Sequence, residues 1–167
     1  MRDYAPPPRT KILLALSEDV KDRFERILQR HDLKTADNAA EAMRCLDQRF
    51  GMVVLSVHFD DSQMFSLLGD IRAHSSYRKV PILCVLGPQR GRILSDIAIE
   101  GLDHAVKAMR ANGFLDLQHF ADDDAGNGRI ARIIDYLILI NGDLQHIART
   151  TGDTIVPLER RRKNGEG

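Results

Sequence analysis

Five short apolar runs, separated by segments with helical periodicity, constrain the fold of this chain more than any other feature of its sequence. The runs cover residues 11–16, 33–36, 52–57, 81–86 and 113–117. In the segments between them, apolar residues recur at i, i+3 and i+4 and so share one helix face. Three of the runs are continuously apolar, which is typical of parallel strands covered on both faces. The alternation predicts an α/β fold with a parallel sheet between two layers of helices.

Helix start signals support this order of elements. Ser17 precedes an acidic first turn formed by Glu18 and Asp19, which favours a helix N-terminus. Asn38 is followed three residues later by Glu41, the spacing of a capping pair. Both signals come directly after an apolar run. They therefore predict that each of the first two strands is followed at once by a helix.

Composition along the chain predicts a single domain with an extension at each end. Three consecutive prolines at 6–8 favour an extended, solvated backbone, so we expect residues 1–9 to be a disordered lead-in. The domain itself is predicted to cover residues 10–142. Residues 143–167 are polar and basic and are predicted to be largely disordered. Residues 87–112 are long for one connection and predict either two helices or one helix with a mobile entry loop.

Charge and cysteine content narrow the environment in which the chain works. Lys plus Arg and Asp plus Glu both count 24, so the formal net charge is zero and no overall field attracts nucleic acid or anionic lipid. A short basic run at 160–163 is a weak signal for nucleic acid, and we expect a solvated tail there. Cys45 and Cys84 fall inside apolar patterns, as buried free thiols do in a reducing compartment. With no membrane span and no signal peptide in the sequence, we expect a cytoplasmic protein without membrane contacts.

Several short segments, in their order and spacing, resemble the receiver domain of two-component response regulators. The resemblance spans roughly residues 10–142 and implies a flavodoxin-like (βα)5 three-layer sandwich with a five-stranded parallel sheet. It also implies a role in signal transduction. The matching segments are residues 11–14, 35–42, 51–56, 67–73, 80–85 and 111–115.

The positions on which receiver function depends carry other residues in this chain. The resemblance places the acidic metal-binding pair at Leu16 and Ser17, and the phosphoryl-accepting aspartate at Ser56. It places the switch hydroxyl at Leu86 and the conserved lysine at Leu117. A serine hydroxyl is a poor nucleophile without an adjacent base. The resemblance therefore implies a degenerate pseudo-receiver, for which we expect no catalytic residue, no metal and no cofactor.

These substitutions predict a stand-alone module that acts by protein contact and without phosphorylation. About 25 residues follow the last predicted helix, too few for the usual DNA-binding output module. The resemblance implies a partner such as a histidine kinase or another signalling protein, or a second copy of the chain. It also implies a docking face made by the fourth helix, fifth strand and fifth helix. On that face we single out Arg110, Arg129, Arg132 and Tyr136.

A second hypothesis is a sensor of a small anionic ligand or nucleotide. Arg90 and Arg92 follow the fourth apolar run, at the sheet edge where open α/β folds bind ligands. Their spacing is neither a dinucleotide fingerprint nor a P-loop. A small enzyme on the same fold ranks lowest, because the strand ends supply no set of nucleophile, base and orienting group.

A shifted magnesium site is a further alternative. Glu18 and Asp19 follow the first apolar run, and Asp60 and Asp61 follow the third. The carboxyl ends of parallel strands share one edge of a sheet, and hard cations need only oxygen ligands. Helix-terminal and loop positions explain the same four residues equally simply.

Overall fold

The computed structural model describes residues 5–88 and 93–151, in which strands and helices alternate in the predicted order. The strands are β1 (Lys11–Ala15), β2 (Asp32–Thr35), β3 (Met52–Ser56), β4 (Ile82–Leu86) and β5 (Gly113–Asp116). The helices are α1 (Glu18–Ile27), α2 (Ala39–Cys45), α3 (Met64–Ala73), α4 (Asp96–Ala108) and α5 (Asp124–Thr151). Three 3₁₀ turns accompany them, η1 (Leu46–Gln48), η2 (Ser75–Tyr77) and η3 (Leu117–His119).

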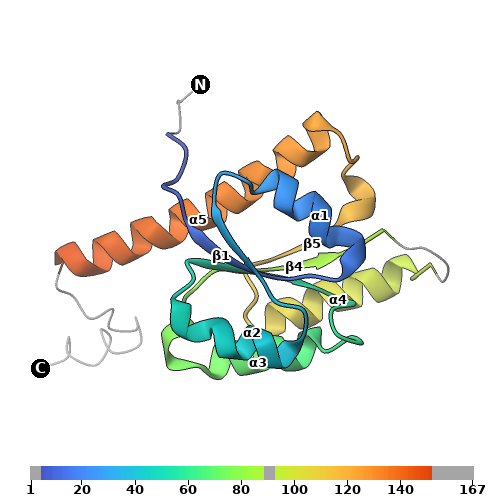
Figure 1. Cartoon of the computed structure of the whole chain (residues 1–167), viewed down its shortest axis with the longest axis horizontal. Helices are drawn as coiled ribbons and strands as arrows, with labels where there is room; N and C mark the ends of the chain where they lie inside the picture. Colours follow the sequence, from blue (N-terminus) through green and yellow to red (C-terminus); the bar gives the residue numbers. More distant parts are fainter. Residues whose placement is uncertain (1–4, 89–92, 152–167) are drawn as a thin grey trace, which may run out of the picture.

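The five strands form one parallel sheet in the order β2-β1-β3-β4-β5. Helices α1 and α5 cover one face of this sheet, and α2, α3 and α4 cover the other (Figure 1). The predicted flavodoxin-like three-layer sandwich is confirmed.

Successive side chains of each strand enter two separate cores. In β1, Ile12 and Leu14 pack with the residues of α1 and α5, whereas Leu13 and Ala15 pack with those of α2 and α3. All four side chains are buried. Because both faces of the sheet are covered, the positions of the central strands are apolar apart from Lys11 of β1 and Ser56 of β3, which accounts for the apolar runs in the sequence.

Part of the predicted lead-in contacts the domain. Pro7 is buried, and its carbonyl accepts a hydrogen bond from Arg30 Nη1 at 3.4 Å. The next carbonyl, that of Pro8, accepts one from Thr10 Oγ1 at 2.9 Å. A proline segment has no internal hydrogen bonds, so its carbonyls are available to the domain and its rings can cover apolar surface.

The last helix is longer than the sequence predicted. Its backbone stays helical to Thr151, nine residues beyond the expected end of the domain at residue 142. Good helix formers in this segment, such as Leu144 and Ala148, outweigh the single helix-weakening Gly142. The rest of the predicted extension lies outside the described residues, and the domain boundary itself stays a prediction.

Residues 87–112 contain one helix, α4, preceded by a loop. Ser95 caps the helix through its hydroxyl, which accepts from the backbone N–H of Ala98 at 3.3 Å. Of the two arrangements predicted for this stretch, a single helix after an entry loop is the one observed. Residues 89–92 of that loop lie outside the described part of the chain.

Candidate functional site

At the carboxyl end of β3, where the sequence placed Ser56, a hydrogen bond joins this residue to Ser17, the second residue after β1. The backbone N–H of Ser17 donates to Ser56 Oγ at 2.7 Å, and the two hydroxyl oxygens lie 3.1 Å apart. Ser56 is 1% exposed. Ser17 occupies the N-cap position of α1, as predicted, but its hydroxyl makes no capping hydrogen bond to the helix. The structure therefore brings Ser17 and Ser56 together, in a partly buried hydroxyl pair.

The three leucines that the resemblance placed at functional positions are core residues. Leu16 and Leu117 pack in the core beneath α1 and α5. Leu86 packs in the core on the opposite face of the sheet. All three are buried, at 5%, 3% and 0% exposure respectively. Apolar side chains thus contribute to packing at each of these strand ends, where they can neither bind a cation nor donate a hydrogen bond to a ligand.

The two aspartates after β3 do not point to a common ligand. Asp60 Oδ2 accepts a hydrogen bond from the backbone N–H of Ala39, at the start of α2, at 2.9 Å. Asp60 and Asp61 both have a positive φ, 47° and 52°, and Asp61 is exposed. Such left-handed backbone is tolerated by aspartate better than by most residues. The first of the pair serves the N-terminus of a helix.

The other two acidic residues lie at the start of α1. Asp19 leans over the end of β4, where a Cβ built on Gly87 would lie 2.6 Å from Asp19 Oδ2. Glu18 is exposed. Within residues 5–88 and 93–151, no three acidic, histidine or cysteine side chains gather in a way that could hold a metal ion. The described side chains therefore give no support to the alternative of a shifted magnesium site, which stays a prediction.

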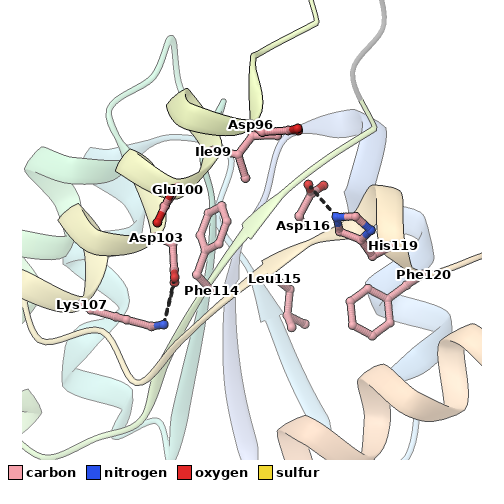
Figure 2. Close-up of a pocket in the computed structure, with 10 residues that line it drawn as sticks. All are labelled: Asp96, Ile99, Glu100, Asp103, Lys107, Phe114, Leu115, Asp116, His119 and Phe120. Atoms are coloured by element: carbon pink, nitrogen blue, oxygen red, sulfur yellow. Dashed lines mark hydrogen bonds and ion pairs between the residues drawn. The ribbon is translucent and has the colours of Figure 1, made fainter.

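A groove of about 640 Å³ opens beside this edge, between α4 and β5. Figure 2 shows aromatic and aliphatic side chains in it, with carboxylates of α4 and β5 around them. The residues that line it are Asp96, Ile99, Glu100, Asp103, Lys107, Phe114, Leu115, Asp116, His119 and Phe120. Four carboxylates against one lysine give the groove an acidic character when its histidine is neutral.

The most buried carboxylate of the groove is Asp116, at the end of β5. It is 8% exposed and pairs in register with Leu86 of β4. Its Oδ1 accepts from the backbone N–H of Gln118 at 3.0 Å, and its Oδ2 lies 3.6 Å from Nε2 of the exposed His119. The sequence did not single out Asp116, because the resemblance placed a functional position at its neighbour Leu117. The signal was present, since aspartate is uncommon inside an apolar strand.

The negative charges that α4 contributes to the groove are only partly neutralised. Lys107 Nζ lies 2.9 Å from Asp103 Oδ1, one helical turn away. Glu100 faces His104 at 4.0 Å, with 72% of its side chain exposed. An exposed pair at this distance contributes little, because water screens it. The carboxylates of Asp96 and Glu100 therefore remain available to a ligand or partner.

The far side of the groove is fixed by a buried arginine of α1. Arg23 Nη2 donates to the carbonyls of Phe120 and Ala121, each at 2.9 Å, and its Nε donates to Asn127 Oδ1 at 2.8 Å. The guanidinium of Arg129 lies over the Phe120 ring, 4.8 Å from the centroid. The loop between β5 and α5 is thereby held against α1.

The predicted docking residues gather only in part. Arg129, Arg132 and Tyr136 line a second hollow on α5 together with Ile133, of about 370 Å³. Arg110 lines neither hollow; it follows α4 with a φ of 68°, and its carbonyl accepts from Arg72 Nη2 at 2.7 Å. The sequence did not single out the groove residues of β5 and η3.

Two sets of predicted residues lie outside the described residues. These are Arg90 and Arg92, proposed for anion binding, and the basic run at 160–163. The two cysteines are within the described part and are buried and free, as predicted. Burial raises the pKa of the Cys84 thiol to about 12, so it is not a reactive nucleophile at neutral pH.

Comparison with known proteins finds a match in fold but none in sequence. No protein-family model matches this sequence. No curated protein sequence matches it either. Solved structures do match in fold. The putative response regulator of Chloroflexus aurantiacus superposes with a TM-score of 0.62 at 16% identity, covering 79% of this chain and 99% of that one.

Two further structures give the same result. The chemotaxis response regulator CheY4 of Vibrio cholerae has a TM-score of 0.59 at 19% identity, over 76% of this chain and 99% of its own. The receiver domain of sensor histidine kinase PA1611 of Pseudomonas aeruginosa, solved with magnesium in its active-site cleft, has a TM-score of 0.60 at 17% identity, over 78% and 98%. The chain is thus a doubly wound α/β protein. More narrowly, it has the CheY-like fold of response-regulator receiver domains.

Proposed function

We propose that this chain is a receiver-like signalling module that works without phosphorylation, by binding a protein partner. The observation that carries the proposal is the hydrogen bond between Ser17 and the buried Ser56 at the end of β3. In the resemblance to receivers, Ser56 stands at the phosphoryl-accepting position and Ser17 at one of the metal-binding positions. The contacts of Ser56 Oγ are with the backbone N–H and the hydroxyl of Ser17, and neither group is a base that could activate it as a nucleophile.

The leucines at the neighbouring strand ends support the same conclusion. A phosphoryl group needs cations or hydrogen-bond donors around its oxygens. Leu16, Leu86 and Leu117 supply neither, and all three are packed in the two cores. Restoring a phosphorylation site would require replacing core side chains as well as Ser56. The Pseudomonas aeruginosa receiver domain, by contrast, was solved with magnesium in its active-site cleft.

The groove between α4 and β5 is the surface that we assign to the partner. It combines an apolar floor, including Phe114 and Phe120, with exposed carboxylates on α4 (Figure 2). Aromatic anchors surrounded by charges are typical of protein docking sites. A histidine kinase or another signalling protein with a basic, apolar-anchored segment fits this chemistry. Within the described residues, no helix is both long and apolar enough to cross a membrane.

Exposure to a small phosphodonor tests the first half of the proposal. The purified chain is incubated with acetyl phosphate and magnesium, and intact mass is measured, with a phosphorylatable receiver domain as the positive control. We expect no added phosphoryl group on this chain and one on the control. An acid-stable or acid-labile phosphoryl adduct that maps to residues 16–19 or 56–61 would contradict the proposal.

Partner capture tests the second half. Tagged wild type and a groove variant carrying Glu100→Lys with Asp103→Lys are compared in native lysate, and any recovered protein is then purified and titrated directly. The matched control is Asp22→Lys, a charge reversal at an exposed position on α1. We expect the groove variant to weaken binding at least tenfold and the control to leave it unchanged. Equal binding by all three chains would remove the groove from the proposal.

A further inference from the structure

Residues 5–10, which we call the strap, are held against the domain by two residues of the turn between α1 and β2. The backbone N–H of Thr10 donates to His31 Nδ1 at 3.2 Å. The carbonyl of the buried Pro7 accepts from Arg30 Nη1 at 3.4 Å. The three successive prolines of the strap have no N–H to donate, so its attachment depends on its carbonyls and on the N–H of Thr10.

His31 uses one ring nitrogen to hold the strap and leaves the other without a hydrogen bond. Because Nδ1 accepts from Thr10, the neutral ring carries its proton on Nε2. Nε2 is buried and has no hydrogen-bond partner, and Asp135 Oδ1 of α5 lies 3.5 Å from it. The whole residue is 3% exposed. A carboxylate next to an unpaired ring nitrogen is an arrangement that a second proton on the ring would change.

Two charged groups face the ring, Arg30 from its own turn and Asp135 from α5. They also bind each other, since Arg30 Nη2 donates to Asp135 Oδ1 at 2.8 Å. The same guanidinium therefore contacts both α5 and the strap carbonyl. Arg9 of the strap and Asp32 of β2 flank these residues in the chain and are exposed.

Protonation of the ring acts on both strap contacts at once. The added proton occupies Nδ1, so the ring and the backbone N–H of Thr10 become two donors that face each other, and their hydrogen bond is lost. The imidazolium attracts the carboxylate of Asp135 and repels the guanidinium of Arg30. Arg30 is then driven from the position in which it donates to Pro7.

We propose that His31 is a proton-sensitive latch that holds the strap against the domain when its ring is neutral and releases it when the ring is protonated. Release uncovers the surface beneath Pro7 while the sheet and its helices stay folded. The latch uses the end of the domain at which β1 begins. It is independent of the groove between α4 and β5 and of the function proposed for that groove.

Linkage gives the direction of the response. In the held state, burial, followed by the charge of Arg30, lowers the pKa of His31. In the released state the ring is solvated, and its pKa returns toward the ordinary value of about 6.5. The released state therefore binds the proton more tightly, so the strap is held above pH about 6.5 and is released as pH falls toward the pKa of the held state.

Amide NMR of the full chain, recorded between pH about 7.5 and about 5, tests the proposal. We expect the order parameters of the Arg9 and Thr10 amides to fall from about 0.85 to below about 0.6. The midpoint of this change should coincide with the titration of the His31 ring, followed in the same samples. The amide of Val54, in the buried strand β3, should stay rigid throughout.

Two variants and a matched control separate the latch from other effects of pH. His31→Asn offers Thr10 an acceptor that does not titrate, so the strap should stay held at every pH. Arg30→Met removes a strap contact and a like charge beside the ring, so release should move to higher pH by about half a unit or more. Arg44→Met, at an exposed position on α2, should keep the wild-type midpoint.

The wild-type titration decides the proposal even if a variant does not fold. Arg9 and Thr10 amides that stay rigid through the ring titration overturn it, as does a His31 ring that stays neutral until the chain unfolds. Loss of order in Val54 together with the strap would mean global unfolding and would also overturn it. A folded His31→Asn chain that releases its strap at the wild-type midpoint would show that another group is the latch.

Discussion

The backbone N–H of Ser17 donates to Ser56 Oγ at 2.7 Å, which joins the end of β1 to the end of β3 across 39 residues of sequence. Ser56 is therefore a structural residue. We expect Ser56→Ala to lower the free energy of unfolding by about 1–3 kcal/mol, because a partly buried N–H loses its acceptor. Urea denaturation measures the change. Ser66→Ala, at an exposed position on α3, is the control and should be nearly neutral; equal effects of the two substitutions would contradict the role assigned to Ser56.

Two glycines of α5 should respond to alanine in opposite directions. A Cβ on Gly126 would lie 1.9 Å from the carbonyl oxygen of Ala121, whereas a Cβ on Gly128 meets its nearest neighbour, Arg132 Nη1, at 4.0 Å. We expect Gly126→Ala to destabilise the fold by about 2 kcal/mol or more through overpacking. Gly128→Ala should stabilise it by about 0.5–1 kcal/mol, since alanine loses less backbone entropy in a helix. Thermal melts compare the pair, and a stabilising Gly126→Ala would show that the backbone before α5 is not fixed as described.

Arg72 is a buried guanidinium that holds three segments of the chain together. Its Nη1 donates to the carbonyls of Tyr77 and Val80, each at 2.7 Å, and its Nη2 donates to the carbonyl of Arg110 at 2.7 Å and to Asn112 Oδ1 at 2.9 Å. Arg72 is 4% exposed, and burial lowers its pKa from the ordinary value.

Replacing this guanidinium leaves several oxygens without donors. We expect Arg72→Met to cost about 3–5 kcal/mol of unfolding free energy, since the carbonyls that it satisfies lose their hydrogen bonds. Arg44→Met, at an exposed position on α2, should change stability by less than about 0.5 kcal/mol. Guanidinium denaturation with a common slope gives both values. A loss of less than about 1 kcal/mol at Arg72 would mean that water replaces the guanidinium.

His31 should make stability depend on pH. Its Nδ1 accepts from the backbone N–H of Thr10 at 3.2 Å, so the neutral ring carries its proton on Nε2. That buried nitrogen has no hydrogen bond; Asp135 Oδ1 lies 3.5 Å away, and Asp135 is bound by Arg30 at 2.8 Å. Burial, followed by the charge of Arg30, lowers the pKa of His31 despite the opposing carboxylate of Asp135.

The lowered pKa of His31 sets the direction in which stability changes with pH. The unfolded chain binds a proton at His31 at higher pH than the folded chain does. The contribution of neutral His31 to the free energy of unfolding is therefore complete above pH about 6.5 and is lost as pH falls toward the pKa of His31 in the folded chain. We expect the free energy of unfolding to decrease from pH about 7.5 to about 5.5 in the wild type, and to decrease less in His31→Asn. His104→Asn, an exposed histidine, should follow the wild type. An identical pH dependence in all three chains would assign the effect to other groups.

Much of the fold could be predicted because local sequence patterns specify its strands and helices. Continuous apolar runs such as residues 52–57 predicted the central strands, and the spacing of Asn38 and Glu41 predicted the start of α2, where Asn38 Oδ1 accepts from the backbone N–H of Glu41 at 2.8 Å. The burial of Cys84 followed from its place in an apolar run. Such features depend on residues close together in sequence, so periodicity and capping rules can predict them.

The sequence by itself determined the order of the elements, the α/β class and the apolar residues at the strand ends. Only the tertiary structure decided that Ser17 turns its hydroxyl to Ser56 instead of capping α1, that Asp60 serves α2, and that Asp116 borders a groove with α4. It also decided that Tyr136 and Ile140 of α5 are exposed. The physical reason is that each of these relationships joins segments distant in sequence. Hydrogen-bond partners and covered faces are chosen by packing, and local pattern cannot specify them.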